Sequence, residues 1–420
     1  KDVLIGEVWV ASGQSNMVFP VAQSGPYGGL TNAADVVAAA DVPEVRMFTV
    51  GEAKSGAPQE TMKGSWAVAS KESVPRMSAV GYLFANGLHK ELKVPVGVIT
   101  AAYGASTCEA WISRDALAAD AAIKPMLDQF DASMAFYKTN PTAPLGQAPK
   151  RPTPINKARP AATARQSDPV QDQHEPTVLF NGMLNPVIPY AIRGAIWYQG
   201  ESLCYGDEGV SNYGHVQAAM IGDWRRRWGE GDFPFYLVEL PGQQNLSNNP
   251  RIREQQAAAM KLAPNTAMAC VIDTGEARNV HPRNKQPLGD RLTKIALANA
   301  YGQKIEYSGP VYDSMKVEGG NIRIKFTHLG APDHEPKLVA KGGPLKWFQI
   351  AGDDQKFVDA TATIDGDSII VSSPSVARPA AVRYAWDNYP DGCNLYNAAD
   401  IPASPFRTDT WKYPLAGLVE

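Results

Sequence analysis

The first group that could do chemistry is a serine at the end of the first hydrophobic segment. Residues 3–11 (VLIGEVWVA) are apolar enough for a buried strand, and the polar sequence SGQSNM follows at once. Open α/β sheets keep their sites at the carboxyl ends of strands, although Gly, Ser and Asn also form ordinary turns. Met17 replaces the second glycine of the Gly-x-Ser-x-Gly elbow of α/β-hydrolases. Ser15 is therefore a candidate nucleophile outside that motif.

Two further strand ends carry groups that could stabilise an oxyanion. Gly104 follows the apolar segment 94–102 and can offer a backbone N–H without a side chain in the way. Gln199 follows the apolar segment 191–198, and its amide can donate to a developing negative charge. Three successive strand ends thus present a hydroxyl, a bare backbone and an amide.

One of the six histidines is placed to serve as a general base. His281 comes after the apolar segment 267–272 and before a segment with helical periodicity. A serine nucleophile is activated by an adjacent base, most often histidine. We therefore expect His281 to take the serine proton.

The elements that must position these groups alternate between strands and helices. Such alternation predicts parallel pairing and a layered α/β domain. After about residue 305 the segments become short, β-branched or aromatic, and bounded by turn residues, which predicts antiparallel pairing. We expect an α/β domain over 1–305 and a smaller β-rich domain over 306–420. The six expected strands of the first domain are 3–11, 45–50, 94–102, 191–198, 233–240 and 267–272.

A proline-rich segment interrupts the first domain at about 140–176. Six prolines lie between residues 140 and 160. Proline is excluded from helix interiors and central strands, so the segment is predicted to be an extended surface insertion. It serves either as a plain excursion or as an element that shapes the substrate site.

Composition excludes several partners. The 420 residues include 40 basic and 43 acidic side chains, and the net charge of -3 gives no reason to expect nucleic acid or an anionic membrane. The only compact basic run, residues 224–228, is predicted to be a solvated helix face. No apolar stretch approaches the roughly 20 residues that span a bilayer. The chain begins with Lys1 and has no signal-peptide pattern, which indicates a processed or a trimmed chain. We expect a periplasmic or secreted location.

No metal site is predicted. His328 and His334 lie near acidic residues, but a polar turn is the favoured interpretation. The cysteines lie far apart without a CxxC pair, which argues against a zinc site. We expect buried free thiols, with a Cys108–Cys204 bridge as the alternative. The four cysteines are Cys108, Cys204, Cys270 and Cys393.

Five ordered blocks resemble one known family. They are GEVWVASGQSNM, YGASTCEAW, FNGMLNPVIPYAIRGAIWYQGES, REQQ and VHPRNKQPLGDRL. These blocks are similar to those of the sialate O-acetylesterase-like branch of the SGNH hydrolases, which includes polysaccharide acetylesterases. The C-terminal segments GPVYDSM and VRYAWDNYP resemble the β-rich region of its long members. The resemblance implies a flavodoxin-like, three-layer parallel sheet.

The resemblance also assigns roles. Ser15 matches the nucleophile and His281 its base. The backbone N–H groups of Ser15 and Gly104, with the side chain of Gln199, match the oxyanion donors. The implied reaction is ester hydrolysis through an acetyl-enzyme, with no metal or organic cofactor.

Two positions depart from the family pattern. Ala105 stands where the second of two glycines is usual. Arg278 stands three residues before His281, where the general pattern has an aspartate. Glu276 or Asp273 could orient the imidazole instead, or a backbone carbonyl could leave a Ser-His dyad. We favour Glu276.

The remaining expectations concern the substrate. Trp111 and Glu201 are predicted to bind substrate or to support the site. We expect an acetylated polysaccharide or oligosaccharide, with an O-acetylated sialic acid or a non-catalytic carbohydrate-binding role as alternatives. A sialic acid would need an arginine and a neutral glycan an aromatic platform. The candidates are Arg114, Arg253, Arg278, Arg283, Tyr103, Trp111 and Tyr198.

Overall fold

The computed structural model describes residues 2–143, 147, 167–204 and 210–412. The chain divides into two compact units. The first comprises Lys1–Leu237, Gln255–Ala267 and Arg283–Lys285, and the second comprises Val238–Glu254, Met268–Pro282 and Gln286–Glu420.

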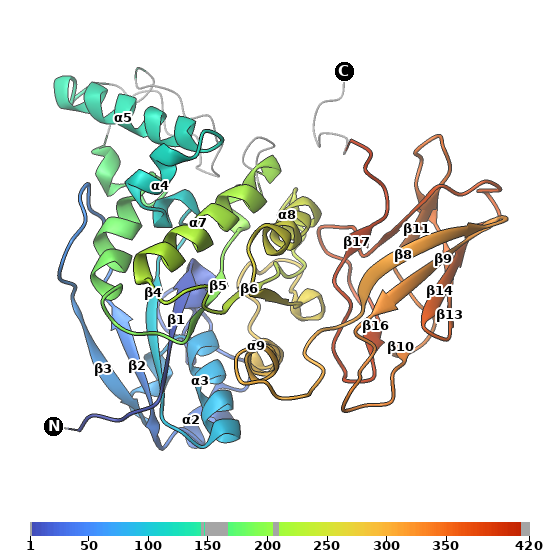
Figure 1. The fold of residues 1–420 in the computed structure, drawn as a ribbon, viewed down its shortest axis with the longest axis horizontal. Coiled ribbons are helices and arrows are strands. Elements are labelled where there is room, and N and C mark those ends of the chain that lie inside the picture. The colour runs from blue at the N-terminus through green and yellow to red at the C-terminus, as the bar shows by residue number, and fades with distance from the viewer. Residues whose placement is uncertain (1, 144–146, 148–166, 205–209, 413–420) are drawn as a thin grey trace. The chain divides into compact units, whose positions relative to one another are not determined.

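A seven-stranded sheet organises the α/β part of the chain, in the order β3-β2-β4-β1-β5-β6-β7 (Figure 1). β1 pairs parallel with β4 and β5, β2 with β4, and β5 with β6, whereas β3 pairs antiparallel with β2. The predicted layered α/β fold is confirmed. The strands are β1 Glu7–Gly13, β2 Val42–Val50, β3 Gly64–Ala69, β4 Val96–Ala102, β5 Gly194–Tyr198, β6 Phe235–Val238 and β7 Thr266–Ala269.

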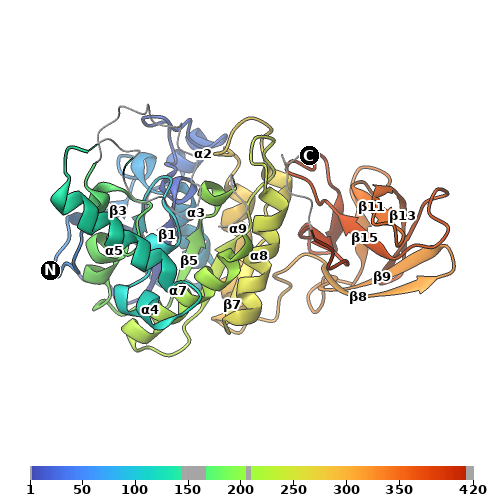
Figure 2. The ribbon, with the colours of Figure 1, turned by 90° about the horizontal axis from the view of Figure 1, so that it is seen from above.

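Helices cover both faces of this sheet. Figure 2 shows α3 (Ala79–Leu92) on one side and α4 (Arg114–Ala119) and α7 (Tyr213–Trp228) on the other. Ser78 caps α3, where the Gly81 N–H donates to its hydroxyl over 3.1 Å. The other helices are α1 Ser15–Val18, α2 Ala33–Ala38, α5 Lys124–Thr139, α8 Asn249–Leu262 and α9 Gln286–Asn299.

Three details differ from the sequence-based expectations. β1 begins only at Glu7, and Ile5 before it is exposed. β3 was not predicted, because its residues are mostly exposed and do not form a long apolar run. The basic run 224–228 ends α7, but Arg225 is buried, where its guanidinium donates to the Phe233 carbonyl oxygen over 2.7 Å. Only part of that run is a solvated face.

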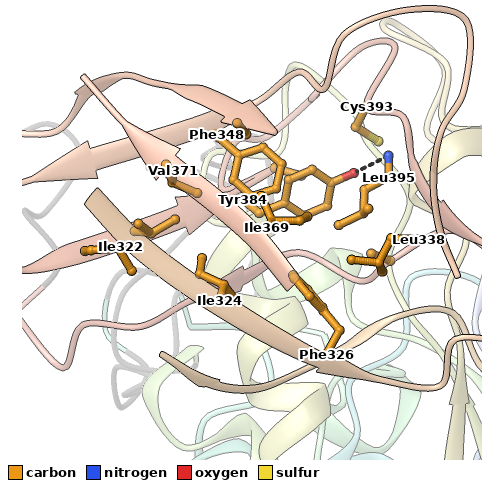
Figure 3. Close-up of a cluster of buried hydrophobic side chains, with 14 of the residues drawn as sticks. Ile322, Ile324, Phe326, Leu338, Phe348, Ile369, Val371, Tyr384, Cys393 and Leu395 are labelled. Carbon is orange, nitrogen blue, oxygen red and sulfur yellow. Dashed lines mark hydrogen bonds between the residues drawn. The ribbon is translucent and has the colours of Figure 1, made fainter. Parts of the chain in front are cut away.

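The β-rich part forms three antiparallel sheets, as the sequence predicts. Their orders are β13-β14-β9-β8, β12-β11-β15-β17 and β10-β16. Alternate residues of β9 point inward, so Ile322, Ile324 and Phe326 enter a core with Ile369 and Val371 of β14 (Figure 3). The strands are β8 Val311–Glu318, β9 Asn321–Thr327, β10 Leu338–Ala340, β11 Phe348–Ala351, β12 Val358–Asp359, β13 Thr361–Asp365, β14 Ser368–Ser372, β15 Ala381–Tyr384, β16 Leu395–Asn397 and β17 Phe406–Arg407.

The second unit is larger than the range 306–420. It also contains α9 and the loops that follow β6 and β7. Buried polar contacts bind these parts together, since Arg291 of α9 makes a two-pronged ion pair with Asp273, and the Tyr396 hydroxyl donates to the same carboxylate. A domain boundary at 305 stays a prediction.

The structure also bears on the cysteines, the proline-rich insertion and membrane-spanning helices. The four cysteines are free and buried, as predicted. Most of the proline-rich insertion lies outside the described residues, at 144–146 and 148–166. Within the part of the chain that the structure covers, no helix has both the length and the apolarity to cross a membrane.

Candidate active site

Three strands end at the same level of the sheet. Gly13, the last residue of β1, pairs with Ala102 at the end of β4 and with Tyr198 at the end of β5. The Gly13 carbonyl oxygen accepts the Tyr103 N–H over 3.0 Å. The turns that carry the predicted nucleophile and the two predicted oxyanion donors therefore begin side by side.

Ser15 and Gly104 lie next to each other. Ser15 is half-buried at the start of α1, between the buried residues Gln14 and Asn16. A Cβ placed on Gly104 would lie 4.0 Å from the Ser15 Cβ. Gly104 and Ser15 are therefore neighbours, and the role of Gly104 as an oxyanion donor stays a prediction.

The second position of the glycine turn is strained. Ala105 has a φ of 55°, in the left-handed region. That conformation costs a residue with a Cβ about 1–2 kcal/mol, which explains why a glycine is expected there. The turn nevertheless keeps its shape with alanine, because the methyl group is exposed.

The carboxamide of Gln199 is held in one orientation. Its Nε2 donates to the Ser106 carbonyl oxygen over 3.0 Å, and its Oε1 accepts the Tyr213 hydroxyl over 2.6 Å. Gln199 has no exposed surface. One hydrogen of Nε2 is thus committed to the Ser106 carbonyl oxygen, next to the Gly104 turn.

Trp111 supports the segment that follows Gly104. Its side chain is fully buried, its Nε1 donates to the Ser106 hydroxyl over 3.0 Å, and its carbonyl oxygen accepts the Trp224 indole N–H over 2.9 Å. A ring without exposed surface cannot stack on a sugar. Of the two roles that the sequence left open for Trp111, the geometry supports the structural one.

Glu201 belongs to a buried polar chain beneath the serine. Glu201 Oε1 accepts Asn16 Nδ2 over 2.5 Å, and Asn16 Oδ1 accepts Lys285 Nζ over 2.5 Å. All three residues are at most 4% exposed. The Lys285 ammonium also lies 5.3 Å from the ring centre of Phe19 and 5.0 Å from that of Tyr198. Glu201 and Lys285 therefore position the residue after Ser15.

Burial governs the charge of Glu201. Loss of solvent raises the pKa of this carboxyl, although the Asn16 hydrogen bond and the Lys285 charge oppose the rise. Its Oε2 finds no hydrogen-bond partner among the residues that the structure describes. These features again favour a role inside the protein over direct contact with substrate.

Tyr27 is a neighbour of the site that the sequence did not indicate. Its hydroxyl lies 3.9 Å from the position of a Cβ on Gly104. Burial, and then the charge of Glu52, raise the pKa of Tyr27. Because the loop that holds Tyr27 carries no recognisable motif, only the fold could bring it to Gly104.

The predicted base lies on a tight turn of the second unit. Glu276 and Asn279 form an antiparallel bridge. The Asn279 side chain donates to Glu276 Oε2 over 2.9 Å, and its Oδ1 accepts the His281 backbone N–H over 3.0 Å. Asn279 thus links the predicted third member to the backbone of the predicted base.

The geometry distinguishes Asp273 from Glu276, the two carboxylates that could orient the His281 imidazole as the third member of a catalytic triad. Both oxygens of Asp273 accept from Arg291 over 2.7 Å, and Oδ2 also accepts the Tyr396 hydroxyl over 3.0 Å. Asp273 is therefore committed to a structural ion pair. Glu276 is on the same turn as His281 and remains the better candidate.

The other polar candidates have structural partners. Arg114 pairs with Asp131, and Arg253 is buried, where its Nε donates to the Leu240 carbonyl oxygen. Arg283 belongs to the first unit, and its Nε donates to the Gly29 carbonyl oxygen, two residues from Tyr27. Arg283 is therefore held against the Tyr27 loop.

No metal centre is found in the described ranges. His328 Nδ1 lies 2.8 Å from Glu306 Oε1, and His334 pairs with Asp333. Within those ranges no group of three or more His, Cys, Asp or Glu residues could hold an ion. The two histidines belong to polar turns.

The sheet carries the neighbouring Ser15 and Gly104 at the carboxyl ends of β1 and β4, which is where open α/β sheets keep their sites. The family model described as "Carbohydrate esterase, sialic acid-specific acetylesterase" matches residues 174–298. The structure of a carbohydrate acetylesterase from Xanthomonas citri is 34% identical, with a TM-score of 0.79 over 98% of this chain and 82% of that one. The chain belongs to the sialate O-acetylesterase-like family of carbohydrate esterases, which confirms the resemblance seen in the sequence.

Curated relatives agree with this membership. The sialate O-acetylesterase of Rattus norvegicus is 28% identical over 441 residues, which cover 96% of this chain and 78% of the relative. The human sialate O-acetylesterase is 27% identical over 442 residues, with 96% and 75% covered.

Proposed function

We propose that this protein is a serine esterase that removes O-acetyl groups from carbohydrates through an acetyl-enzyme. The observation that carries the proposal is that Ser15 and the bare Gly104 turn are neighbours just past the paired ends of β1 and β4, with the Ser15 Cβ 4.0 Å from the position of a Cβ on Gly104. Family membership supports the reaction class, since the named relatives are carbohydrate or sialate acetylesterases.

The proposed reaction has two steps, acetylation of Ser15 and hydrolysis of the acetyl-enzyme. Ser15 Oγ attacks the acetyl carbonyl carbon while His281 takes the serine proton. The N–H groups of Ser15 and Gly104, with the side-chain amide of Gln199, hold the oxyanion. Collapse of the intermediate expels the sugar oxygen, which takes the proton from His281.

The second step restores the enzyme. A water molecule attacks the acetyl-serine carbonyl and gives a proton to His281. Acetate leaves, and the proton returns to Ser15 Oγ. Every step uses side chains and backbone groups of this chain, so no cofactor is invoked.

Chain continuity supports the assignment of His281. Arg283 and Lys285 belong to the first unit, and Lys285 is bonded to Asn16, the residue after Ser15. His281 precedes Arg283 by two residues, so their Cα atoms lie within about 7 Å of each other. Glu276, on the same turn, is the proposed partner that orients the imidazole.

The proposed substrate is an acetylated polysaccharide or oligosaccharide. A sialic acid ester is the second candidate, favoured by Arg283 against the Tyr27 loop and by Lys54, whose Nζ donates to the Tyr103 hydroxyl over 2.8 Å. The proposed location is periplasmic or secreted.

The test compares acetate release from acetylated xylo-oligosaccharides and from O-acetylated sialic acid, with Ser15→Ala as the blank. We expect release from the oligosaccharides that disappears in the variant. Preference for the sialic acid would select the second candidate. No release from either substrate, together with binding of a glycan, would indicate a carbohydrate-binding protein and overturn the proposal.

A further inference from the structure

The second unit carries an exposed tryptophan in an unfavourable backbone conformation. Trp347 keeps 36% of its surface exposed and has a φ of 63°, directly before β11. A bulky side chain in the left-handed region is rare. About a third of this residue is exposed to solvent, and backbone strain of this kind concentrates at ligand sites.

Trp347 and a second aromatic residue, Tyr389, both form hydrogen bonds with Asp391. Trp347 Nε1 donates to the Asp391 carbonyl oxygen over 2.7 Å. The Tyr389 hydroxyl lies 3.3 Å from Asp391 Oδ1. The two side chains are therefore held at one place on the surface of the second unit, with a carboxylate beside them.

This aromatic pair adjoins the turn that bears the predicted base. A Cβ on Gly242 would lie 3.0 Å from Tyr389 Cδ2, and a Cβ on Gly275 would meet the Gly242 carbonyl oxygen at 2.3 Å. Gly275 immediately precedes Glu276. Tyr389 thus packs on Gly242, and Gly242 packs on the turn that bears the predicted base, where the close contact requires a glycine at Gly275.

The pKa of Tyr389 reflects its burial and its position near Asp391 and the predicted catalytic residue Glu276. Burial raises the pKa of Tyr389, and the carboxylates of Asp391 and Glu276 raise it further. A neutral tyrosine hydroxyl and a carboxylate can bond the hydroxyl groups of a sugar. The aromatic faces can stack on its C–H face, as apolar surface with a polar handle does in other binding sites.

We propose that Trp347 and Tyr389 form a glycan subsite that binds sugar residues beside the acetylated one. The inference rests on the proposed deacetylase function and deepens it, because it selects a chain of sugars over a single acetylated residue. Asp391 orients both aromatic side chains and accepts from substrate hydroxyls.

The test compares Trp347→Ala with Trp66→Ala on two substrates. Trp66 is a matched control, since it is exposed to 39% but lies on β3 of the other unit. For acetylated xylo-oligosaccharides, Trp347→Ala should lower kcat/KM about tenfold through a higher KM. For p-nitrophenyl acetate, which has no sugar, both variants should match the wild type.

A loss of about tenfold corresponds to about 1.4 kcal/mol. Trp347→Phe keeps a ring and should recover part of the loss, which separates stacking from unfolding. Equal effects on both substrates, no effect on the oligosaccharide, or the same effect from Trp66→Ala would overturn the subsite.

Failure of the proposed function gives a different result. If the wild type releases no acetate from any acetylated carbohydrate, the deacetylase proposal fails by itself. The subsite is then tested by calorimetric titration with deacetylated xylo-oligosaccharide. Binding by the wild type that Trp347→Ala abolishes would support the subsite, and absence of binding by the wild type would refute it.

Discussion

Gly13 lets the chain turn from β1 into the helix that begins at Ser15. Its φ is 132°, and a Cβ there would meet the Tyr198 carbonyl oxygen at 2.1 Å. Any other residue would force β1 away from β5. The position of the serine therefore depends on a glycine that does no chemistry.

The role of Gln199 can be tested at the level of single atoms. Gln199→Ala removes the proposed oxyanion donor and should lower kcat about 10²–10³-fold. Tyr213→Phe is the control, because it removes the bond to Oε1 and leaves Nε2 in place. We expect a much smaller loss of kcat in Tyr213→Phe. Equal losses in both variants would mean that Gln199 acts only through packing, and thermal melts would show whether both remain folded.

Sequence reasoning named the residues on strand ends and offered Trp111 and Glu201 as supports, but it missed Lys285. Ser15, Gly104 and Gln199 are detectable because each follows an apolar segment. Lys285 is not, because its contact with Asn16 joins positions 269 apart. Such a contact exists only once the sheet has formed, so composition and periodicity carry no trace of it.

At the scale of elements, the segment 273–281 carries two carboxylates with different hydrogen-bond partners. Asp273 holds the buried Arg291, whereas Glu276 is linked through Asn279 to His281. The two carboxylates are three residues apart and have different predicted roles.

Two isosteric substitutions test this division. Glu276→Gln should lower kcat up to about 10⁴-fold, as for the loss of a triad carboxylate, with little change in stability. Asp273→Asn should keep kcat per folded molecule but lower the free energy of unfolding by about 3 kcal/mol, because it leaves Arg291 partly unpaired. Kinetics and urea unfolding measure the two effects. The reverse assignment of losses would make Asp273 the catalytic partner.

Elements were predicted where apolar patterns are long. The central strands and the antiparallel C-terminal part agree with expectation, since buried strands need such patterns. β3 was not predicted because its residues are mostly exposed. The start of β1 was predicted too early because Ile5 is apolar but exposed. A short edge strand and an exposed apolar residue depend on what covers them, which local sequence does not encode.

At the scale of the whole molecule, a buried carboxyl couples stability to pH. Glu239 is 1% exposed, and burial raises its pKa to about 7 from 4.5, against the attraction of Arg253. Between these two pH values the folded state binds a proton that the unfolded state has lost. Stability from this group is therefore greatest at the acid end and falls as the pH rises.

A substitution isolates this effect. A rise of the pKa from 4.5 to about 7 corresponds to about 3 kcal/mol, present as a penalty above the folded-state pKa. Glu239→Gln removes the ionisable group, so the variant should gain stability relative to the wild type between about pH 5 and pH 8. Urea unfolding across this range measures the difference. A difference between the two proteins that does not change with pH would contradict the raised pKa.

The central claim is that Ser15 carries the acetyl group during turnover. Its most direct test is an acid quench of the wild type during hydrolysis of an isotopically labelled acetyl ester, followed by peptide mass spectrometry. We predict one labelled acetyl group on the peptide that contains Ser15, and none in Ser15→Ala. Label on another residue, or turnover by folded Ser15→Ala near the wild-type rate, would contradict the account.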